Sequence, residues 1–151
     1  MNLQDEIKEL KERISELEEQ VDEEQTFPNY KDFYWGINAK GKVFCDTWED
    51  FKFEKDMLAI GNVYQTENEA VFAVEKLKVE AELRKFSRPF EFGKINTEFY
   101  YGHESREIMF SSLKTCQMQG SIYFESEEKA QQAIASVGKE RIKKYLFGVE
   151  D

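Results

Sequence analysis

Nucleophilic catalysis needs a serine or cysteine beside a base, and this sequence holds one histidine, His103. Ser105 and Cys116 are the nucleophiles that could be paired with it. His103 lies in the segment Gly-His-Glu-Ser, which is typical of a turn, and no orienting pattern accompanies it. The spacing therefore favours a solvent-facing loop histidine, and we expect the protein not to be an enzyme.

A run of carboxylates between residues 46 and 56 could bind Mg²⁺ if its members converged, because hard cations prefer carboxylate oxygens. The run consists of Asp46, Glu49, Asp50, Glu54 and Asp56. It alternates with Trp48, Phe51 and Phe53, which is more typical of a wet edge with an aromatic underside. We therefore expect no metal and no cofactor. We interpret the exposed part of this segment as a contact for a protein partner, made by Asp46, Trp48, Glu49, Asp50 and Glu54.

Aromatic and basic side chains offer the alternative site, for the bases and phosphates of a nucleic acid or a nucleotide. The aromatic candidates lie in predicted strands and are Tyr34, Trp35, Phe99, Tyr100 and Tyr101. The basic candidates near the C-terminus are Lys139, Arg141, Lys143 and Lys144. A net charge of −10 disfavours binding to a phosphate backbone. A contact by Tyr100, Lys143 and Lys144 is therefore kept as the alternative to protein binding.

Residues 1–25 carry the clearest positional signal, a heptad seam with Leu at d and β-branched residues at a. The seam consists of Leu3, Ile7, Leu10, Ile14, Leu17 and Val21. This choice of residues favours two parallel helices. In that arrangement Glu6 meets Lys11 of the partner helix, and Arg13 meets Glu18. We therefore predict a parallel coiled-coil homodimer; packing of this helix on its own domain and a higher oligomer are the alternatives.

The remaining chain predicts a linker at residues 26–31 and an α+β domain at residues 32–151, in which two helices cover antiparallel strands. In the first half of this domain we expect a hairpin turning at 39–41, a loop or short helical turn at 49–60, an extended piece at 63–65 and a helix capped by Thr66 and Glu69. In the second half we expect a hairpin turning at 102–106, a strand at 119–125, a helix capped by Ser126 and a short helix at 139–147.

The helix predicted to begin after Thr66 has a narrow apolar face suited to packing on a sheet. This face is formed by Ala70, Ala73, Val74, Leu77 and Ala81. The two cysteines, Cys45 and Cys116, are far apart, so we expect reduced thiols, buried or half-buried, in a cytoplasmic protein. No apolar run is long enough to predict a membrane span.

The chain also contains a weak internal repeat. Gly61-Asn-Val-Tyr-Gln-Thr66 resembles Gly120-Ser-Ile-Tyr-Phe-Glu-Ser126, and the apolar spacing after each capping residue is similar. The sequence therefore suggests a duplicated unit of hairpin, strand and helix over residues 32–88 and 89–147. Convergent turn and helix chemistry would give the same similarity, so both explanations stay open.

Several short motifs between Trp35 and Val149 resemble small accessory proteins of phages and prophages of low-GC Gram-positive bacteria. The motifs are Trp35-x-Ile37, the segment from Gly61 to Ala73, Leu77-Lys78-Val79 and Tyr145-Leu-Phe-Gly-Val149. The resemblance implies a mobile-element origin in an infected or lysogenic host, and no catalytic residue can be carried over from it. By analogy we expect an acidic, dimeric inhibitor that sequesters a host protein, with an anti-defence protein of the anti-CRISPR kind as one example.

Overall fold

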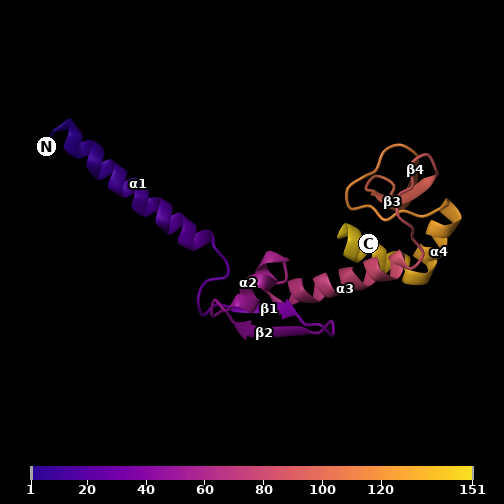
Figure 1. Cartoon of the computed structure of the whole chain (residues 1–151), viewed down its shortest axis with the longest axis horizontal. Coiled ribbons are helices and arrows are strands. Elements are labelled where there is room, and N and C mark those ends of the chain that lie inside the picture. The colour runs from indigo at the N-terminus through magenta and orange to yellow at the C-terminus, as the bar shows by residue number, and fades with distance from the viewer. Residues whose placement is uncertain (1, 151) are drawn as a thin grey trace.

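The computed structural model describes residues 2–150, and for residues 22–25 it describes the backbone alone (Figure 1). Helices and strands together form an α+β fold, which confirms the predicted class. The elements are α1 (Leu3–Gln25), β1 (Phe33–Ile37), β2 (Val43–Thr47), α2 (Lys52–Ala59), α3 (Glu67–Arg84), β3 (Asn96–Gly102), β4 (Glu107–Leu113), α4 (Glu127–Val137) and α5 (Lys139–Phe147).

The helix α1 stands apart from the rest of the molecule (Figure 1). Asn2 begins it, because the Asn2 side-chain oxygen accepts hydrogen bonds from the amides of Gln4 and Asp5. Every side chain of α1 from Leu3 to Val21 is exposed. The alternative in which this helix packs on its own domain is therefore wrong.

The first hairpin pairs β1 with β2 in antiparallel register and packs its inner face around Tyr34, which is fully buried. The Tyr34 ring makes edge contacts with Phe44 and Trp48. A Cβ atom added to Gly36 would lie 2.6 Å from Cε of Met57, so the glycine permits α2 to approach the strand closely. Residues 49–60, which were predicted to be a loop or short helical turn, contain the regular helix α2.

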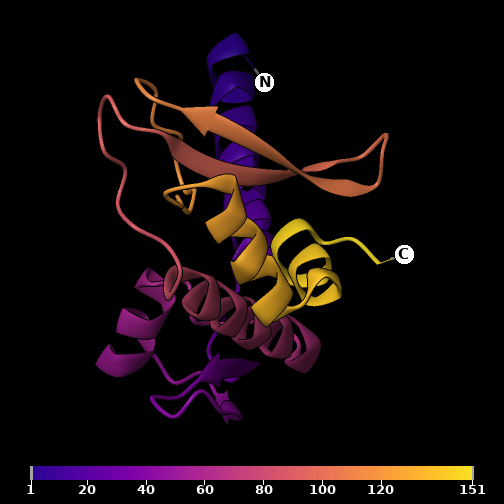
Figure 2. The ribbon, with the colours of Figure 1, turned by 90° about the vertical axis from the view of Figure 1, so that its right-hand side faces the viewer.

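The second hairpin pairs β3 with β4 in antiparallel register and packs on α4 and α5 (Figure 2). Adjacent residues of β3 divide between the two faces, since Phe99 joins the core whereas Tyr100 is exposed. The main core lies between this hairpin and three helices, and its buried members are Val79, Leu83, Phe124, Ala130, Ala133, Val137 and Ile142.

The helix α3 runs between the two hairpins and serves both (Figure 1). Its first half buries Ala70 and Val74, and its second half buries Val79 and Leu83 in the main core. The buried face therefore shifts around the helix as its packing partner changes. For this reason the single inward stripe predicted from the sequence is wrong at Leu77 and Ala81, which are both exposed.

The two halves of the body share a local pattern. Tyr64 forms an isolated antiparallel bridge to Trp35 of β1, and two residues later Thr66 caps α3. Phe124 bridges Thr97 of β3 in the same way, and two residues later Ser126 caps α4. The strand predicted at residues 119–125 is thus reduced to one bridge. The halves differ in that α2 interrupts the first and α5 follows the second, so duplication stays a prediction.

Candidate functional site

The apolar seam of α1 is the largest exposed apolar feature that the sequence singled out. All six of its predicted members are exposed: Leu3, Ile7, Leu10, Ile14, Leu17 and Val21. A shallow hollow on this face is lined by Ile14, Leu17, Glu18 and Val21, and a similar one lies on the charged flank at Glu6, Glu9, Leu10 and Arg13. In the heptad numbering Ile14, Leu17, Glu18 and Val21 are an a, the following d and e, and the next a. Four such residues form the hole that receives a d-position leucine from a parallel partner helix.

The acidic segment at residues 46–56 is only partly available to a partner. Trp48 is buried, and its indole N–H donates to Asp50 Oδ1 at 2.7 Å. Glu54 is fully buried, and its Oε1 accepts from the backbone amides of Glu49 and Phe51 at 2.9 and 3.1 Å. The prediction that Trp48 and Glu54 contact a partner is therefore wrong. Their side chains are buried and hold the loop between β2 and α2 through hydrogen bonds.

The exposed part of the same segment is acidic and aromatic. Asp46 and Asp50 are exposed, and Glu49 is half-buried. The rings of Phe51 and Phe53 are also exposed and stack on each other, with centroids 5.7 Å apart. The aromatic underside predicted for this segment is therefore wrong for both phenylalanines. Among the described side chains, which are those of residues 2–21 and 26–150, no three acidic, histidine or cysteine side chains come together as a metal site would require.

Tyr34 and Glu54 form a buried polar pair beneath the first hairpin. Burial is the main cause that raises the pKa of Tyr34, and the nearby Glu54 carboxylate raises it further. The Tyr34 hydroxyl and Glu54 Oε2 are both enclosed, yet they lie outside ordinary hydrogen-bond geometry with each other. The pair is a structural contact between β1 and α2.

The alternative nucleic-acid contact is dispersed. Tyr100 lies on the outer face of the second hairpin. Lys143 is buried, and its Nζ donates to the backbone oxygen of Arg106 at 3.1 Å. Lys144 pairs with Glu150 at 2.9 Å, and this hydrogen bond raises the pKa of Lys144. The structure therefore corrects the prediction for Lys143, which anchors the hairpin turn to α5.

The residues considered for nucleophilic catalysis do not pair with His103. His103 is exposed in the turn, and its ring packs against the edge of Tyr101 at 4.9 Å. The hydroxyl of Ser105 lies 3.4 Å from the carbonyl oxygen of Gly102, and the Cys116 thiol lies 3.9 Å from the Thr115 hydroxyl. Both cysteines, Cys45 and Cys116, are exposed, so the expectation of buried thiols is wrong.

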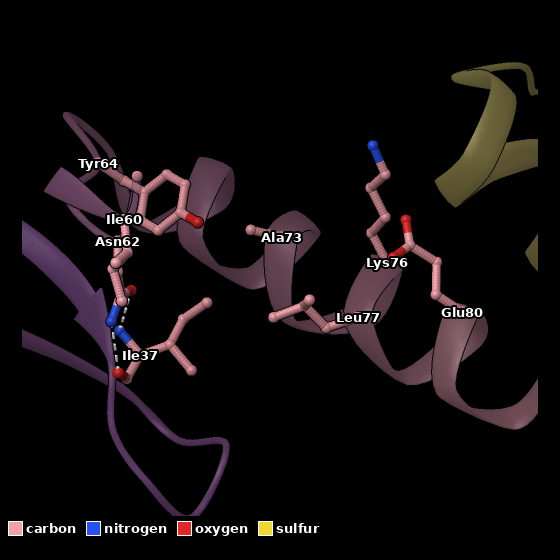
Figure 3. Close-up of a pocket in the computed structure, with 9 residues that line it drawn as sticks. Ile37, Ile60, Asn62, Tyr64, Ala73, Lys76, Leu77 and Glu80 are labelled. Carbon is pink, nitrogen blue, oxygen red and sulfur yellow. Dashed lines mark hydrogen bonds between the residues drawn. The ribbon is translucent and has the colours of Figure 1, made fainter. Parts of the chain in front are cut away.

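A pocket of about 570 Å³ lies between the first hairpin and α3 (Figure 3). Ile37 and Tyr64 approach from the hairpin side, and Ala73 and Leu77 form the wall on α3. Asn62 braces the hairpin side, because its side chain accepts from the Ile37 amide and donates to the Ile37 carbonyl, both at 2.8 Å. The sequence did not predict this pocket, because the helical pattern had indicated that Leu77 lies in the core.

A second pocket, of about 500 Å³, continues along α3 to the other half of the body. Lys76 and Glu80 line both pockets, so they stand where the two hollows meet. Arg84, Phe99 and residues 119–122 line the far side. Both pockets are large enough to accept a side chain of another protein.

No family model, no curated protein and no solved structure matches the chain. Among residues 2–150, none of the helices combines the length and the apolar character that crossing a lipid bilayer requires.

Proposed function

We propose that the chain is a non-enzymatic, protein-binding homodimer joined by α1 in a parallel coiled coil. The observation that carries this proposal is the exposed apolar seam of α1, together with the hollow at Ile14, Leu17, Glu18 and Val21. Exposed leucine, isoleucine and valine side chains in a continuous stripe gain free energy when a second helix covers them. A parallel partner would fill the hollow with its own Leu17.

The dimer would present two copies of the body to one target. Two linked sites raise the apparent affinity without new contacts, provided that both engage at once. We propose that the target is a host protein that the dimer inhibits or sequesters, as the phage resemblance implies. The exposed acidic and aromatic part of residues 46–56 supports a basic contact on that target.

Sedimentation tests the dimer. Wild type is expected to sediment as a dimer at tens of micromolar, and Ile14→Lys as a monomer, because a charge at an a position is buried by pairing. Ser15→Lys is the matched control, since Ser15 lies at a b position that faces solvent in both states. A monomeric wild type, or an Ile14→Lys variant that still dimerises, would contradict the proposal.

Affinity capture from a lysate of the bacterial host tests the partner. We expect one host protein in stoichiometric amount, and its loss when Phe51 and Phe53 are both replaced by alanine. Phe92→Ala is the matched control, because Phe92 is an exposed phenylalanine in the other half of the body. Equal capture by all variants would show that residues 46–56 do not contact the partner.

Nucleic-acid or nucleotide binding is the second proposal, and the exposed ring of Tyr100 is what supports it. Retention on single-stranded DNA that falls with salt and is lost in Tyr100→Ala would favour it over protein binding. Tyr30→Ala would be the control, since Tyr30 is exposed but lies in the linker. Retention that is absent at low salt would count against this second function.

A further inference from the structure

The strand β3 is bonded on both sides, whereas β4 is bonded on one. Thr97 exchanges two backbone hydrogen bonds with Phe124, with N···O distances of 2.9 and 2.8 Å. The N–H and C=O of Thr97 therefore point away from β4, although Ser112 lies directly opposite in register. Thr97 and Ser112 thus form a non-hydrogen-bonded pair, and pairs of the two kinds alternate along an antiparallel ladder.

This alternation decides which backbone groups of β4 face outward. The N–H and C=O groups of Ile108, Phe110 and Ser112 point to the free edge, because the residues between them bond to β3. Within residues 2–150, no backbone group from another element bonds to these three residues. β4 lies on the side of the hairpin away from α4 and α5, so neither helix shields this edge (Figure 2).

The edge of β4 also lacks the features by which proteins protect free edges, which are lysine, proline and bulges. It has the sequence Glu-Ile-Met-Phe-Ser-Ser-Leu, and its one charge, Glu107, lies at the end. The other edge strand, β2, is shorter and carries Asp46. The Asp46 carboxylate accepts a hydrogen bond from the Thr47 amide at 2.7 Å, which occupies one outward group there. β4 is therefore the longer and less protected of the two free strand edges in residues 2–150.

Side chains beside this edge define what would fit. Tyr100 and Met109 lie opposite each other on the outer face of the hairpin and are 45% and 40% exposed. A strand added next to β4 would place one of its side chains beside Met109 on that face. An apolar side chain at the centre of the added segment would cover Met109 and Tyr100.

We propose that the free edge of β4 binds an extended segment of the partner protein as an added β-strand. The proposal rests on the proposed protein-binding function and gives it a binding mode. Hydrogen bonds to Ile108, Phe110 and Ser112 supply sequence-independent affinity, and the Met109–Tyr100 patch selects the apolar residue. A second copy of this chain is the less suitable occupant, because α1 and β4 lie at opposite ends of the molecule (Figure 1). Self-contacts at both ends would join copies into open chains rather than a closed dimer.

The probe is a library of random linear peptides of about twelve residues, displayed on phage and selected on the full-length protein; an added strand uses about five or six residues. Ser112→Pro removes an outward N–H without removing a bond to β3, whereas Ser112→Ala keeps the N–H. We expect selected peptides to bind Ser112→Pro at least about tenfold more weakly than wild type. Ser112→Ala is expected to bind within about twofold of wild type, because its backbone is unchanged.

Amide hydrogen exchange locates the binding. A bound peptide is expected to slow exchange at Ile108, Phe110 and Ser112, and to leave α1 and α2 unchanged. Unaltered affinity in Ser112→Pro, protection confined to other segments, or failure to select any peptide would overturn the proposal. Protection that rises with protein concentration without peptide would assign the edge to a second copy and overturn it as well.

Two further variants keep the test decisive. If Ser112→Pro fails to fold, Met109→Lys replaces it, since the exposed lysine puts a charge where the apolar residue would lie. Met118→Lys is its control, because Met118 is exposed outside the strands. Ile14→Lys separates the two proposals: it abolishes pairing through α1 and leaves the peptide affinity of each copy unchanged. A monomeric wild type, or an Ile14→Lys variant that still dimerises, therefore contradicts only the proposed function. Peptide binding that is unaffected by the β4 variants contradicts only this inference.

Discussion

Arg141 of α5 donates two hydrogen bonds to the carboxylate of Glu82 on α3, at 2.9 Å from Nη1 to Oε2 and 3.2 Å from Nη2 to Oε1. The same guanidinium donates to the carbonyl oxygen of Val137, at the end of α4. One side chain therefore ties the last two helices to the central one. A planar guanidinium suits this task, since it can form parallel bonds with one carboxylate.

A double-mutant cycle measures this pair. Glu82→Gln and Arg141→Gln are each expected to lower the free energy of unfolding by about 0.5–1 kcal/mol, since both side chains are 38% exposed and solvent screens them. The double variant is expected to cost less than the sum of the singles. Chemical denaturation gives all the values. The Glu75–Lys78 pair on α3 is the control, because it joins two residues of one exposed helix turn and is expected to show little coupling.

The pair also predicts a pH dependence. The Arg141 hydrogen bond is the main cause that holds the pKa of Glu82 below its usual value. A carboxyl group with a lowered folded-state pKa stabilises the fold above its unfolded pKa and loses that contribution as the pH falls through the folded pKa. The difference in melting temperature between wild type and Glu82→Gln is therefore expected to be full near pH 7 and to disappear as the pH falls through the lowered folded-state pKa of Glu82. A difference that grows toward acid pH would contradict this assignment.

Two leucines on one helix are expected to differ sharply. Leu83 is fully buried in the main core, whereas Leu77 is 55% exposed at the wall of the pocket on α3. Leu83→Ala is therefore expected to cost about 2–5 kcal/mol of unfolding free energy, and Leu77→Ala about 0.5 kcal/mol. Denaturant unfolding of both variants checks this. Similar losses would mean that the buried face of α3 does not shift along the helix.

Charge reversal on α1 tests the direction of the coiled coil. In the parallel dimer Glu6 faces Lys11 of the other helix, so Lys11→Glu is expected to weaken dimerisation several-fold at low salt. Adding Glu6→Lys to the same chain restores the opposite charges and is expected to restore affinity. Sedimentation at low and high salt measures both. If the double variant dimerises no better than the single one, the helices are not parallel and in register.

Local signals in the sequence were good guides where one turn of chain decides the structure. Thr66 and Ser126 cap their helices, as their hydroxyls accept from the amides of Glu69 and Lys129. Gly148 ends α5 in a left-handed conformation, directly after the short helix predicted at residues 139–147. Both hairpins also form where turn residues predicted them. These features depend on residues within about four positions of one another.

Tertiary partners decided the features that the sequence did not predict correctly. The burial of Glu54 follows from a loop whose amides turn toward one carboxylate, and composition had indicated a wet acidic edge. Lys143 is buried because the hairpin turn of β3 and β4 folds over α5 and offers the Arg106 carbonyl. The open edge of β4 follows from the pairing of Thr97 with Phe124, which no periodicity in the sequence could reveal. Side-chain type alone therefore did not locate the candidate surface.

The isolation of α1 has an evolutionary consequence. Since its side chains from Leu3 to Val21 all face solvent, substitutions there need not be matched by changes in the hydrophobic interior. Natural selection is therefore free to lengthen, shorten or exchange this helix while the remaining fold is preserved. Relatives of this protein that differ in valency but keep the same body would be the expected product of such exchange.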